Sequence, residues 1–277
     1  MALKDILVHV DDSRACRTRI EAAVTLARKH DAKIIGIHVV DIPVLPAYAD
    51  VPLPAEVHEV QRKSFAEAAR RAEKIWAEVT AKAGLGAEWR CEEGALTATL
   101  SLHARYVDLL VLGQVDADDP RSVSAGLADA VVLECGRPVL VVPHGGAGKT
   151  IGDVVLVAWN AKREAVRAVS DAMPILERAS RVVVLTVNAR AEDPDNEGIP
   201  AADICLHLAR HGIETEAENV FGAPAAVGQL VLEHAARVGA DLLVMGAYGH
   251  SRLRELVLGG VTAHVLEHAE IPALLGH

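Results

Sequence analysis

The chain has 277 residues, of which 51% are hydrophobic and 24% are charged. This length accommodates two domains or one large one, and the composition excludes a disordered chain. The formal net charge is −10 and Lys and Arg form no cluster, which argues against nucleic-acid binding. No apolar run reaches the roughly 18 residues of a membrane span, and the N-terminus lacks the apolar segment of a signal peptide. We therefore expect a cytoplasmic protein without a membrane partner.

Short apolar runs in the first half of the chain alternate with longer segments of helical periodicity. The segment Ser13–His30 has apolar residues at helical spacing, and Asp12 or Ser13 is expected to cap its start. The segment Asp41–Leu85 begins with several prolines, which predicts a mobile loop, a candidate lid, before a helix. The runs predicted as buried strands are Ile6–Val10, Lys33–Val40, Ala87–Cys91, Asp108–Leu112 and Pro138–Val142.

The segment His144–Gly152 is polar and rich in glycine, which predicts a linker between two domains. Its Gly148-Lys149-Thr150 resembles the end of a phosphate-binding P-loop. A P-loop needs a further glycine where this chain has Pro143, and it follows a strand and opens a helix. Here the motif precedes a predicted strand, Asp153–Ala158, so we interpret the segment as a linker only.

The second half of the chain repeats the landmarks of the first half in the same order. The first strand and its polar break, DILVHVDDSR, return as DVVLVAWNAKR at Asp153–Arg163. The segment Asp108–Gly113 (DLLVLG) returns as Asp241–Gly246 (DLLVMG), and a glycine-bearing loop, a helix and a short last strand follow each copy. The repeat predicts two domains, 1–145 and 151–277.

Strands that alternate with helices predict right-handed crossovers and a parallel sheet. Only 3% of the residues are aromatic, so aliphatic side chains must build the core. Each half is therefore expected to be an α/β, doubly wound domain with a five-stranded parallel sheet. The cysteines lie far apart without a CxxC pair and are expected to be reduced, buried side chains. They are Cys16, Cys91, Cys135 and Cys205.

The loop after the DLLVMG strand carries features that suit an anion. Glycines at both of its ends permit close backbone approach, and two arginines lie between them. The last glycines precede a predicted helix, Val261–His268, whose N-terminal N–H groups attract phosphate. On pattern alone, a glycine-rich turn with solvated arginines explains the loop equally well. The residues concerned are Gly246, Gly249, Arg252, Arg254, Gly259 and Gly260.

The spacing Gly246-x2-Gly249-x9-Gly259 resembles the nucleotide-binding loop of the universal stress protein family, and the resemblance covers nearly the whole chain as two tandem copies. It implies an adenine nucleotide alpha hydrolase-like fold and a loop that holds the phosphates of ATP. It also implies that adenosine lies against the ends of the first two strands, with an acidic residue at the ribose. Pairing through the fifth strand is implied too, here Val139–Val142 against Ala273–Leu275, which would mimic the family's dimer. Further homodimerisation stays open.

The second half departs from the family pattern at two positions. Gly260 replaces the usual Ser or Thr that touches phosphate, with Thr262 as a candidate substitute, and Asn160 replaces the acidic residue at the ribose. Trp159 either stacks on the base or packs in the strand end, and packing is the simpler interpretation. The candidate binding residues are Ala158, Trp159, Asn160, Val187, Gly246, Gly249, His250, Arg252, Gly259, Gly260, Val261 and Thr262.

The first half keeps the ribose end of the pattern, Asp11, but not its phosphate end. Gly113 and Gly126 match the outer glycines of the loop, whereas Leu127 stands at the Ser/Thr position. Three carboxylates in this loop would repel a triphosphate. They are Asp116, Asp118 and Asp119. We therefore predict one competent nucleotide site per chain, in the second half.

Other patterns carry less weight. Two histidine pairs, His207 with His211 and His264 with His268, have the spacing of metal ligands but no obvious third ligand. Asp11 after a first strand is also compatible with a phospho-receiver domain, but such a domain needs a Lys after its last strand. No set of Ser, His and Asp or of Cys and His is identifiable by spacing. We therefore predict neither catalytic residues nor a metal site.

The resemblance predicts a tandem universal stress protein that binds ATP, with or without Mg²⁺, or a related adenine nucleotide. Such a protein would act as a sensor or regulator in the stress response rather than as an enzyme. Two alternatives stay open. One is a nucleotide-free interaction protein, in which Gly260 and Asn160 mark the loss of binding, and the other is a very weak ATPase.

Overall fold

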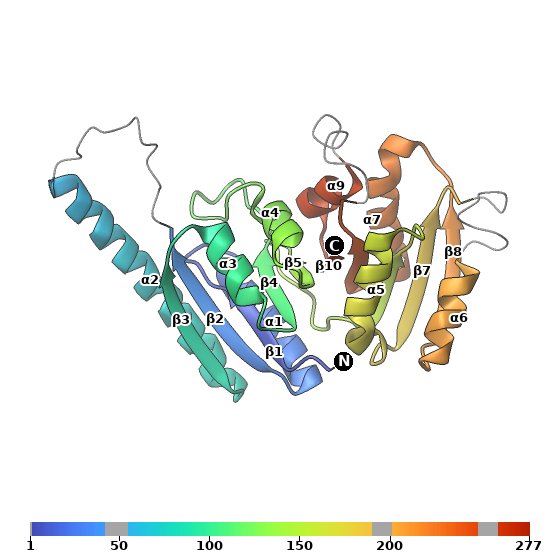
Figure 1. Cartoon of the computed structure of the whole chain (residues 1–277), viewed down its shortest axis with the longest axis horizontal. Helices are drawn as coiled ribbons and strands as arrows, with labels where there is room; N and C mark the ends of the chain where they lie inside the picture. The colour runs from blue at the N-terminus through green and yellow to red at the C-terminus, as the bar shows by residue number, and fades with distance from the viewer. Residues whose placement is uncertain (1, 42–54, 190–200, 249–259) are drawn as a thin grey trace.

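The computed structural model describes residues 2–41, 55–189, 201–248 and 260–277. Within these residues a 10-stranded sheet runs in the order β3-β2-β1-β4-β5-β10-β9-β6-β7-β8 (Figure 1). Each half of the chain contributes five neighbouring strands of this sheet. The two predicted five-stranded sheets are therefore present, and they are joined edge to edge.

The strands of the first half pair in parallel with one another. The predicted strands are present with small shifts at their ends, and the helix expected after the proline-rich segment is α2. That segment itself, with the candidate lid, lies outside the described residues. The elements are β1 (Asp5–His9), α1 (Cys16–His30), β2 (Lys33–Val40), α2 (Ala55–Ala83), β3 (Ala87–Glu93), α3 (Leu96–Ala104), β4 (Leu109–Gly113), α4 (Leu127–Glu134) and β5 (Val139–Val142).

The second half repeats this topology, and its strands also pair in parallel with one another. Its order β8-β7-β6-β9-β10 corresponds to β3-β2-β1-β4-β5 of the first half. The elements are β6 (Val154–Ala158), α5 (Arg163–Leu176), β7 (Arg181–Val187), α6 (Ala202–Arg210), β8 (Thr215–Val220), a 3-10 turn (Pro224–Ala226), α7 (Val227–Val238), β9 (Leu242–Gly246), α9 (Val261–His268) and β10 (Ala273–Gly276).

The last strands of the two halves pair with each other. β5 and β10 run antiparallel, with Leu140 opposite Leu274, so the contact expected between the fifth strands is present. A second contact joins the halves away from these strands: Lys29 in α1 forms an ion pair with Asp153, just before β6. The segment 144–152 between the halves contains no helix, as expected for a linker rather than a P-loop.

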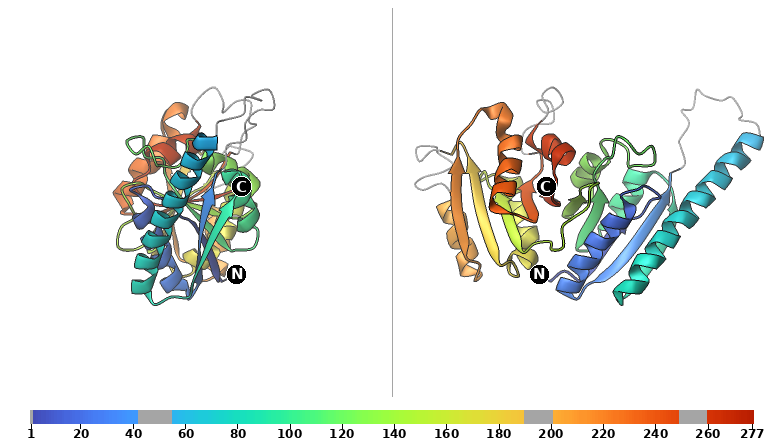
Figure 2. Two further views of the ribbon diagram at one scale, coloured as in Figure 1. Left: turned by 90° about the vertical axis from the view of Figure 1, so that its left-hand side faces the viewer. Right: turned by 180° about the vertical axis from the view of Figure 1, so that it is seen from behind.

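Helices cover both faces of the sheet in each half. In the first half, α1 and α2 lie on one face and α3 and α4 on the other, as the opposite views of Figures 1 and 2 show. One buried apolar cluster contains side chains of α1, α2, α5 and α6, and a second contains those of α3, α4, α7 and α9. This arrangement confirms the predicted doubly wound architecture. It also brings the carboxyl ends of the parallel strands in each half to one edge.

Two local predictions are wrong. Helix α1 begins at Cys16 after Ala15, and neither Asp12 nor Ser13 caps it with a side chain. The hydroxyl of Ser13 instead donates to Oδ1 of Asp11. Of the four cysteines, which are all free, Cys91 is exposed rather than buried because it lies on the edge strand β3.

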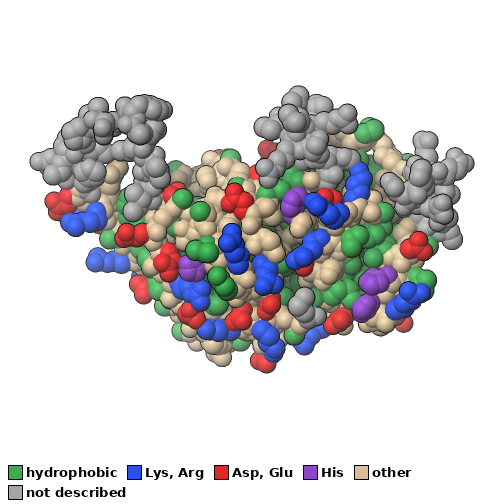
Figure 3. All heavy atoms as spheres, in the orientation of Figure 1, with side chains coloured by type: hydrophobic (Ala, Val, Ile, Leu, Met, Phe, Trp, Pro, Cys, Tyr) green, Lys and Arg blue, Asp and Glu red, His purple; other side chains and the backbone are tan. Residues whose placement is uncertain are grey.

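Within the described residues, no helix has the length and apolar character needed to cross a membrane. On the face shown in Figure 3, Lys and Arg side chains lie among Asp and Glu side chains rather than in one basic area.

Candidate functional site

The strand order reverses at two places, between β1 and β4 in the first half and between β6 and β9 in the second. In an open α/β sheet, ligands bind in the crevice beyond the carboxyl ends of the strands at such a reversal. Asp11 follows β1, and Asn160 stands at the same position after β6. Gly113 and Gly246 end the neighbouring strands β4 and β9. The two crevices are therefore built from equivalent positions and can be compared directly.

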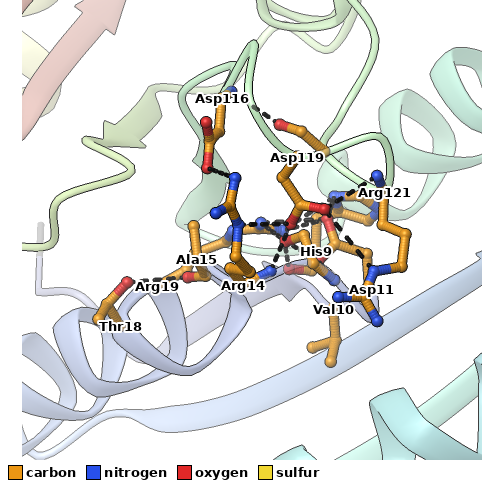
Figure 4. A network of polar contacts seen from close by, with 12 residues as sticks. His9, Val10, Asp11, Arg14, Ala15, Thr18, Arg19, Asp116, Asp119 and Arg121 are labelled. Carbon is orange, nitrogen blue, oxygen red and sulfur yellow. Dashed lines mark hydrogen bonds and ion pairs between the residues drawn. The ribbon is translucent and has the colours of Figure 1, made fainter.

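The first crevice contains a buried guanidinium group. Arg19 of α1 is 2% exposed, and both of its terminal nitrogens lie 3.1 Å from Oδ2 of Asp11 (Figure 4). Its Nη1 also donates to the carbonyl oxygen of His9 at 2.8 Å. A methyl group at Gly113 would lie 2.7 Å from Nη2 of Arg19, so the bare Cα at the end of β4 makes room for this side chain. Arg19 thus fills the crevice between β1 and β4.

The electrostatics of the first crevice keep both Asp11 and Arg19 charged, as an ion pair within the protein. Burial opposes the charge of Asp11, yet Arg19, with His9 and Ser13, holds the pKa of that carboxyl well below its usual range. Burial likewise opposes the charge of Arg19, but Asp11 raises its pKa. Burial, reinforced by Arg19 and His38 and opposed by Asp11, lowers the pKa of His9 to about 4. The acid expected to reach a ribose is therefore already paired within the protein.

The loop after β4 is fastened to the start of α1 by carboxylates. Asp119, with 2% of its side chain exposed, accepts hydrogen bonds from the backbone N–H groups of Arg14 at 2.7 Å and Arg121 at 3.1 Å. Oδ2 of Asp116 lies 3.3 Å from Nη2 of Arg14. Of the three carboxylates expected to face a ligand, only Asp118 is exposed. The expectation of three free carboxylates is therefore corrected, because Arg14 and Arg121 neutralise two of them.

In the second crevice, Gly246 at the end of β9 lies against Glu164 and Ala165 rather than against an arginine, and Glu164 is 9% exposed. Asp11 corresponds to Asn160, and the residue at the spacing of Arg19 is Ala168, which is 1% exposed. Helix α5 lies so close to the end of β9 that a methyl group at Gly246 would be 2.5 Å from the backbone nitrogen of Ala165. Among the described residues, no guanidinium lies against the end of β9 as Arg19 lies against the end of β4.

The strand ends around the second crevice are accessible to solvent. Asn160 is exposed, and its Oδ1 accepts a hydrogen bond from the backbone N–H of Lys162 at 3.1 Å. Ala158 and Val187 end β6 and β7 and are half-buried. These three predicted residues lie at one edge of two paired strands, because Ala158 pairs with Leu185 in the same sheet. They present two apolar surfaces and one amide.

Trp159 is half-buried and packs against the apolar core that contains α5 and α6. Its backbone N–H donates to the carbonyl oxygen of Leu185 at 2.8 Å. This position agrees with the simpler interpretation of the sequence, in which the indole packs in the strand end.

Helix α9 begins next to the second crevice. Gly260 is its N-cap, with φ −62° and ψ 167°, and no side chain caps it. Its backbone is extended, so this position does not require glycine. Thr262 is 5% exposed, and its Oγ1 accepts a hydrogen bond from the backbone N–H of Tyr248 at 3.4 Å. The structure thus brings Gly246, Val261 and Thr262 to one end of the sheet. Of the predicted binding residues, Gly249, His250, Arg252 and Gly259 lie outside the described residues.

Among the residues that the structure describes, no three His, Cys, Asp or Glu side chains gather as metal ligands. The rings of His264 and His268 stack, with centroids 4.3 Å apart and an angle of 19° between their planes. The rings of His207 and His211 meet edge to face at 4.9 Å. Nitrogen lone pairs lie in the ring plane, so the stacked pair does not converge on one ion.

Two residues at these strand ends are not singled out by sequence motifs. Helical spacing does place Arg19 on the same face of α1 as Cys16 and Ala23, which are buried, and a buried arginine needs a partner. The other residue, Gln114, follows β4 and reaches the second half, where its Nε2 donates to the carbonyl oxygen of Glu267 at 3.1 Å. Only the packed fold shows this contact, because 153 positions separate the two residues.

The paired halves and their two crevices define a tandem, doubly wound α/β protein. The profile of the universal stress protein family matches residues 2–143 and 153–276. Because these matches cover most of the chain, the chain belongs to the universal stress protein family and carries its domain twice.

Solved structures agree with this fold. A universal stress protein from Archaeoglobus fulgidus DSM 4304 is 16% identical, with a TM-score of 0.76 over 98% of this chain and 97% of its own. A putative universal stress protein from Pseudomonas aeruginosa UCBPP-PA14 is 15% identical, with a TM-score of 0.62 over 99% of this chain and 93% of its own. The universal stress protein Slr1230 of Synechocystis is 35% identical over 92 residues, which span 33% of this chain and 30% of that relative.

Proposed function

We propose that this protein binds one adenine nucleotide per chain, at the crevice of its second half, and acts as a cytoplasmic sensor or regulator in the stress response. The observation that carries the proposal is the difference between the two crevices. Arg19 fills the first crevice and pairs with Asp11, whereas in the second Asn160 follows β6 and the backbone of Glu164 and Ala165 lies against the end of β9. A ligand is therefore expected at the second crevice, where no described arginine pairs with the residue after the first strand.

The residues around the second crevice suit the two ends of a nucleotide. Ala158 and Val187 provide an apolar surface for the adenosine, and the Asn160 amide can hydrogen-bond ribose hydroxyl groups. The N-terminus of α9 at Val261 offers N–H groups and a positive dipole end to phosphate. The predicted loop residues Gly249, His250, Arg252 and Gly259 complete the phosphate end, and Mg²⁺ would accompany ATP as part of the ligand.

Binding rather than turnover is proposed. Of the described polar side chains near the second crevice, Glu164 is 9% exposed and pairs with Arg163, whereas we assign those of Asn160 and Thr262 to the ligand. Neither is a general base at neutral pH, and the Thr262 hydroxyl already accepts a hydrogen bond. The retained nucleotide would therefore act as a signal that changes what the protein binds.

Titration of the full chain with ATP and Mg²⁺ tests the proposal. Calorimetry should give one site per chain, and an azido-ATP photolabel should attach to peptides from residues 151–277. ATP at 100 times its Kd should stabilise the protein by about 2.7 kcal/mol. If millimolar ATP gives no thermal shift, the nucleotide-free interaction protein becomes the better explanation. If phosphate is released steadily, the protein is a weak ATPase.

Two substitutions should strengthen opposite ends of the site. Asn160→Asp keeps the oxygen that accepts from Lys162 and gives the ribose a charged acceptor, so ATP and adenosine should both bind about five-fold more tightly. Gly260→Ser adds a hydroxyl at an extended N-cap and should tighten ATP by a similar factor but leave adenosine unchanged. Calorimetry with both ligands measures this difference. Equal effects of each variant on both ligands would contradict the proposed orientation.

A further inference from the structure

A side chain of the first half, Gln114, forms hydrogen bonds to the helix at the phosphate end of the second crevice. Gln114 is 5% exposed and follows Gly113 directly at the end of β4. Its Nε2 lies 3.1 Å from the carbonyl oxygen of Glu267 and 3.2 Å from that of Ala269. Its Oε1 accepts a hydrogen bond from the backbone N–H of His144 at 3.1 Å. All polar groups of this amide therefore bridge separate parts of the chain.

The two acceptors lie at the C-terminal end of α9. The last carbonyl groups of a helix have no partner within the helix, so a donor from elsewhere stabilises that end. The helix spans Val261–His268, about 12 Å at 1.5 Å per residue. A helix this short is not stable alone, and contacts from the rest of the fold must fix its position. Gln114 supplies such a contact from the opposite half.

The contact is made in one direction only. The residue equivalent to Gln114 in the second half is Ala247, because both follow the terminal glycine of a strand and both donate a backbone hydrogen bond of 2.8 Å to the neighbouring last strand. The acceptors are Val142 for Gln114 and Gly276 for Ala247. Ala247 has no side-chain donor to offer α4. The first half thus donates side-chain hydrogen bonds to α9 of the second half. The equivalent residue of the second half, Ala247, cannot donate such bonds to α4 of the first.

The one-way contact from Gln114 to α9 and the difference between the two crevices set the halves apart in the same way. The first half, whose crevice is filled by Arg19, donates hydrogen bonds to α9. Helix α9 begins at the other crevice, that of the second half. Val265 and Ala269 of the α9 region also line a small hollow against Gln114 and Val141 at the junction. Contacts from the first half therefore help to determine where the N-terminus of α9 points.

We infer that Gln114 is a positioning residue for the phosphate end of the nucleotide site, and that the first half serves as its support. The inference rests on the proposed function. Loss of the two hydrogen bonds frees the C-terminal end of α9, and the N–H groups at its other end then no longer hold a fixed direction. Phosphate binding should weaken, whereas the adenosine end, built from β6 and β7, should keep its affinity.

The experiment compares ATP and adenosine as ligands of the full chain by calorimetry. Gln114→Met conserves the length of the side chain and removes both donors, so it should bind ATP about five-fold more weakly and adenosine as the wild type does. Gln229→Met is the matched control, because Gln229 is exposed on α7 and, among the described residues, its amide donates to Glu233 of the same helix. It should leave both affinities unchanged.

Two outcomes separate this inference from the function on which it rests. If the wild type binds ATP and Gln114→Met binds it equally well, or loses ATP and adenosine to the same degree, the positioning role is wrong and the proposed function stands. If the wild type binds neither ligand, both are wrong. Hydrogen exchange of the wild type provides a second measurement that needs no variant. ATP, but not adenosine, should slow exchange of the His144 amide, and an unchanged rate would overturn the inference.

Discussion

Replacing Arg19 by alanine is expected to lower the free energy of unfolding by about 3–5 kcal/mol, because it leaves the carboxylate of Asp11 buried without its partner. The side chains of Arg19 and Asp11 are 2% and 13% exposed, so water cannot readily take the place of the guanidinium. The loss also removes the donor to the carbonyl oxygen of His9. Urea denaturation followed by circular dichroism at pH 7.5 measures the effect.

A matched control lies on the same helix. Arg17 forms an ion pair with Glu78, and both side chains are more than 40% exposed, so Arg17→Ala should barely move the denaturation midpoint. The double variant Arg19→Met with Asp11→Asn should be more stable than Arg19→Ala, because it leaves no charge buried alone. Equal losses for Arg17→Ala and Arg19→Ala would show that the filled crevice is not an important source of stability.

The fold could be predicted from the sequence because parallel strands buried on both faces consist of apolar runs. All five residues of β4 are buried, and their run is easily found. The edge strand β3 is less apparent. Prediction ended it at Cys91, but it continues through Glu92 and Glu93, because one side of an edge strand faces water and tolerates charge. The repeat then made the second half predictable from the first.

The sequence also located both crevices, because Asp11 and Asn160 each follow a predicted first strand. It could not assign the partners of these residues. The hydrogen bond from the Arg14 backbone to Asp119 joins positions 105 residues apart, and no local sequence pattern predicts it. The expected capping role of Ser13 failed for a local reason, because its hydroxyl donates to Asp11 and α1 begins only at Cys16. Polar residues after a first strand therefore marked both crevices, but only the packed fold showed whether a crevice was already filled.

The buried His9 should make the protein less stable as the pH falls from 6.5 to 4. Burial, together with Arg19 and His38 and against the attraction of Asp11, lowers the pKa of His9 to about 4. Between this pKa and the usual value of about 6.5, the unfolded chain binds a proton at His9 and the folded chain does not. Stability from this group is therefore fully present above pH 6.5 and is lost as the pH falls, by about 3 kcal/mol in total.

Comparison of the wild type with His9→Gln isolates this contribution from the other groups that titrate in the same range. A glutamine carbonyl can still accept from Nη1 of Arg19, which contacts Nδ1 of His9 at 3.2 Å, but it does not titrate. The difference between the urea midpoints at pH 7.5 and pH 4.5 should be larger for the wild type than for His9→Gln. The exposed His144 provides the control variant His144→Gln, whose midpoints should follow the wild type. Parallel pH profiles for all three proteins would mean that His9 keeps the same proton affinity in the folded and unfolded chains, and that the first crevice is open to water.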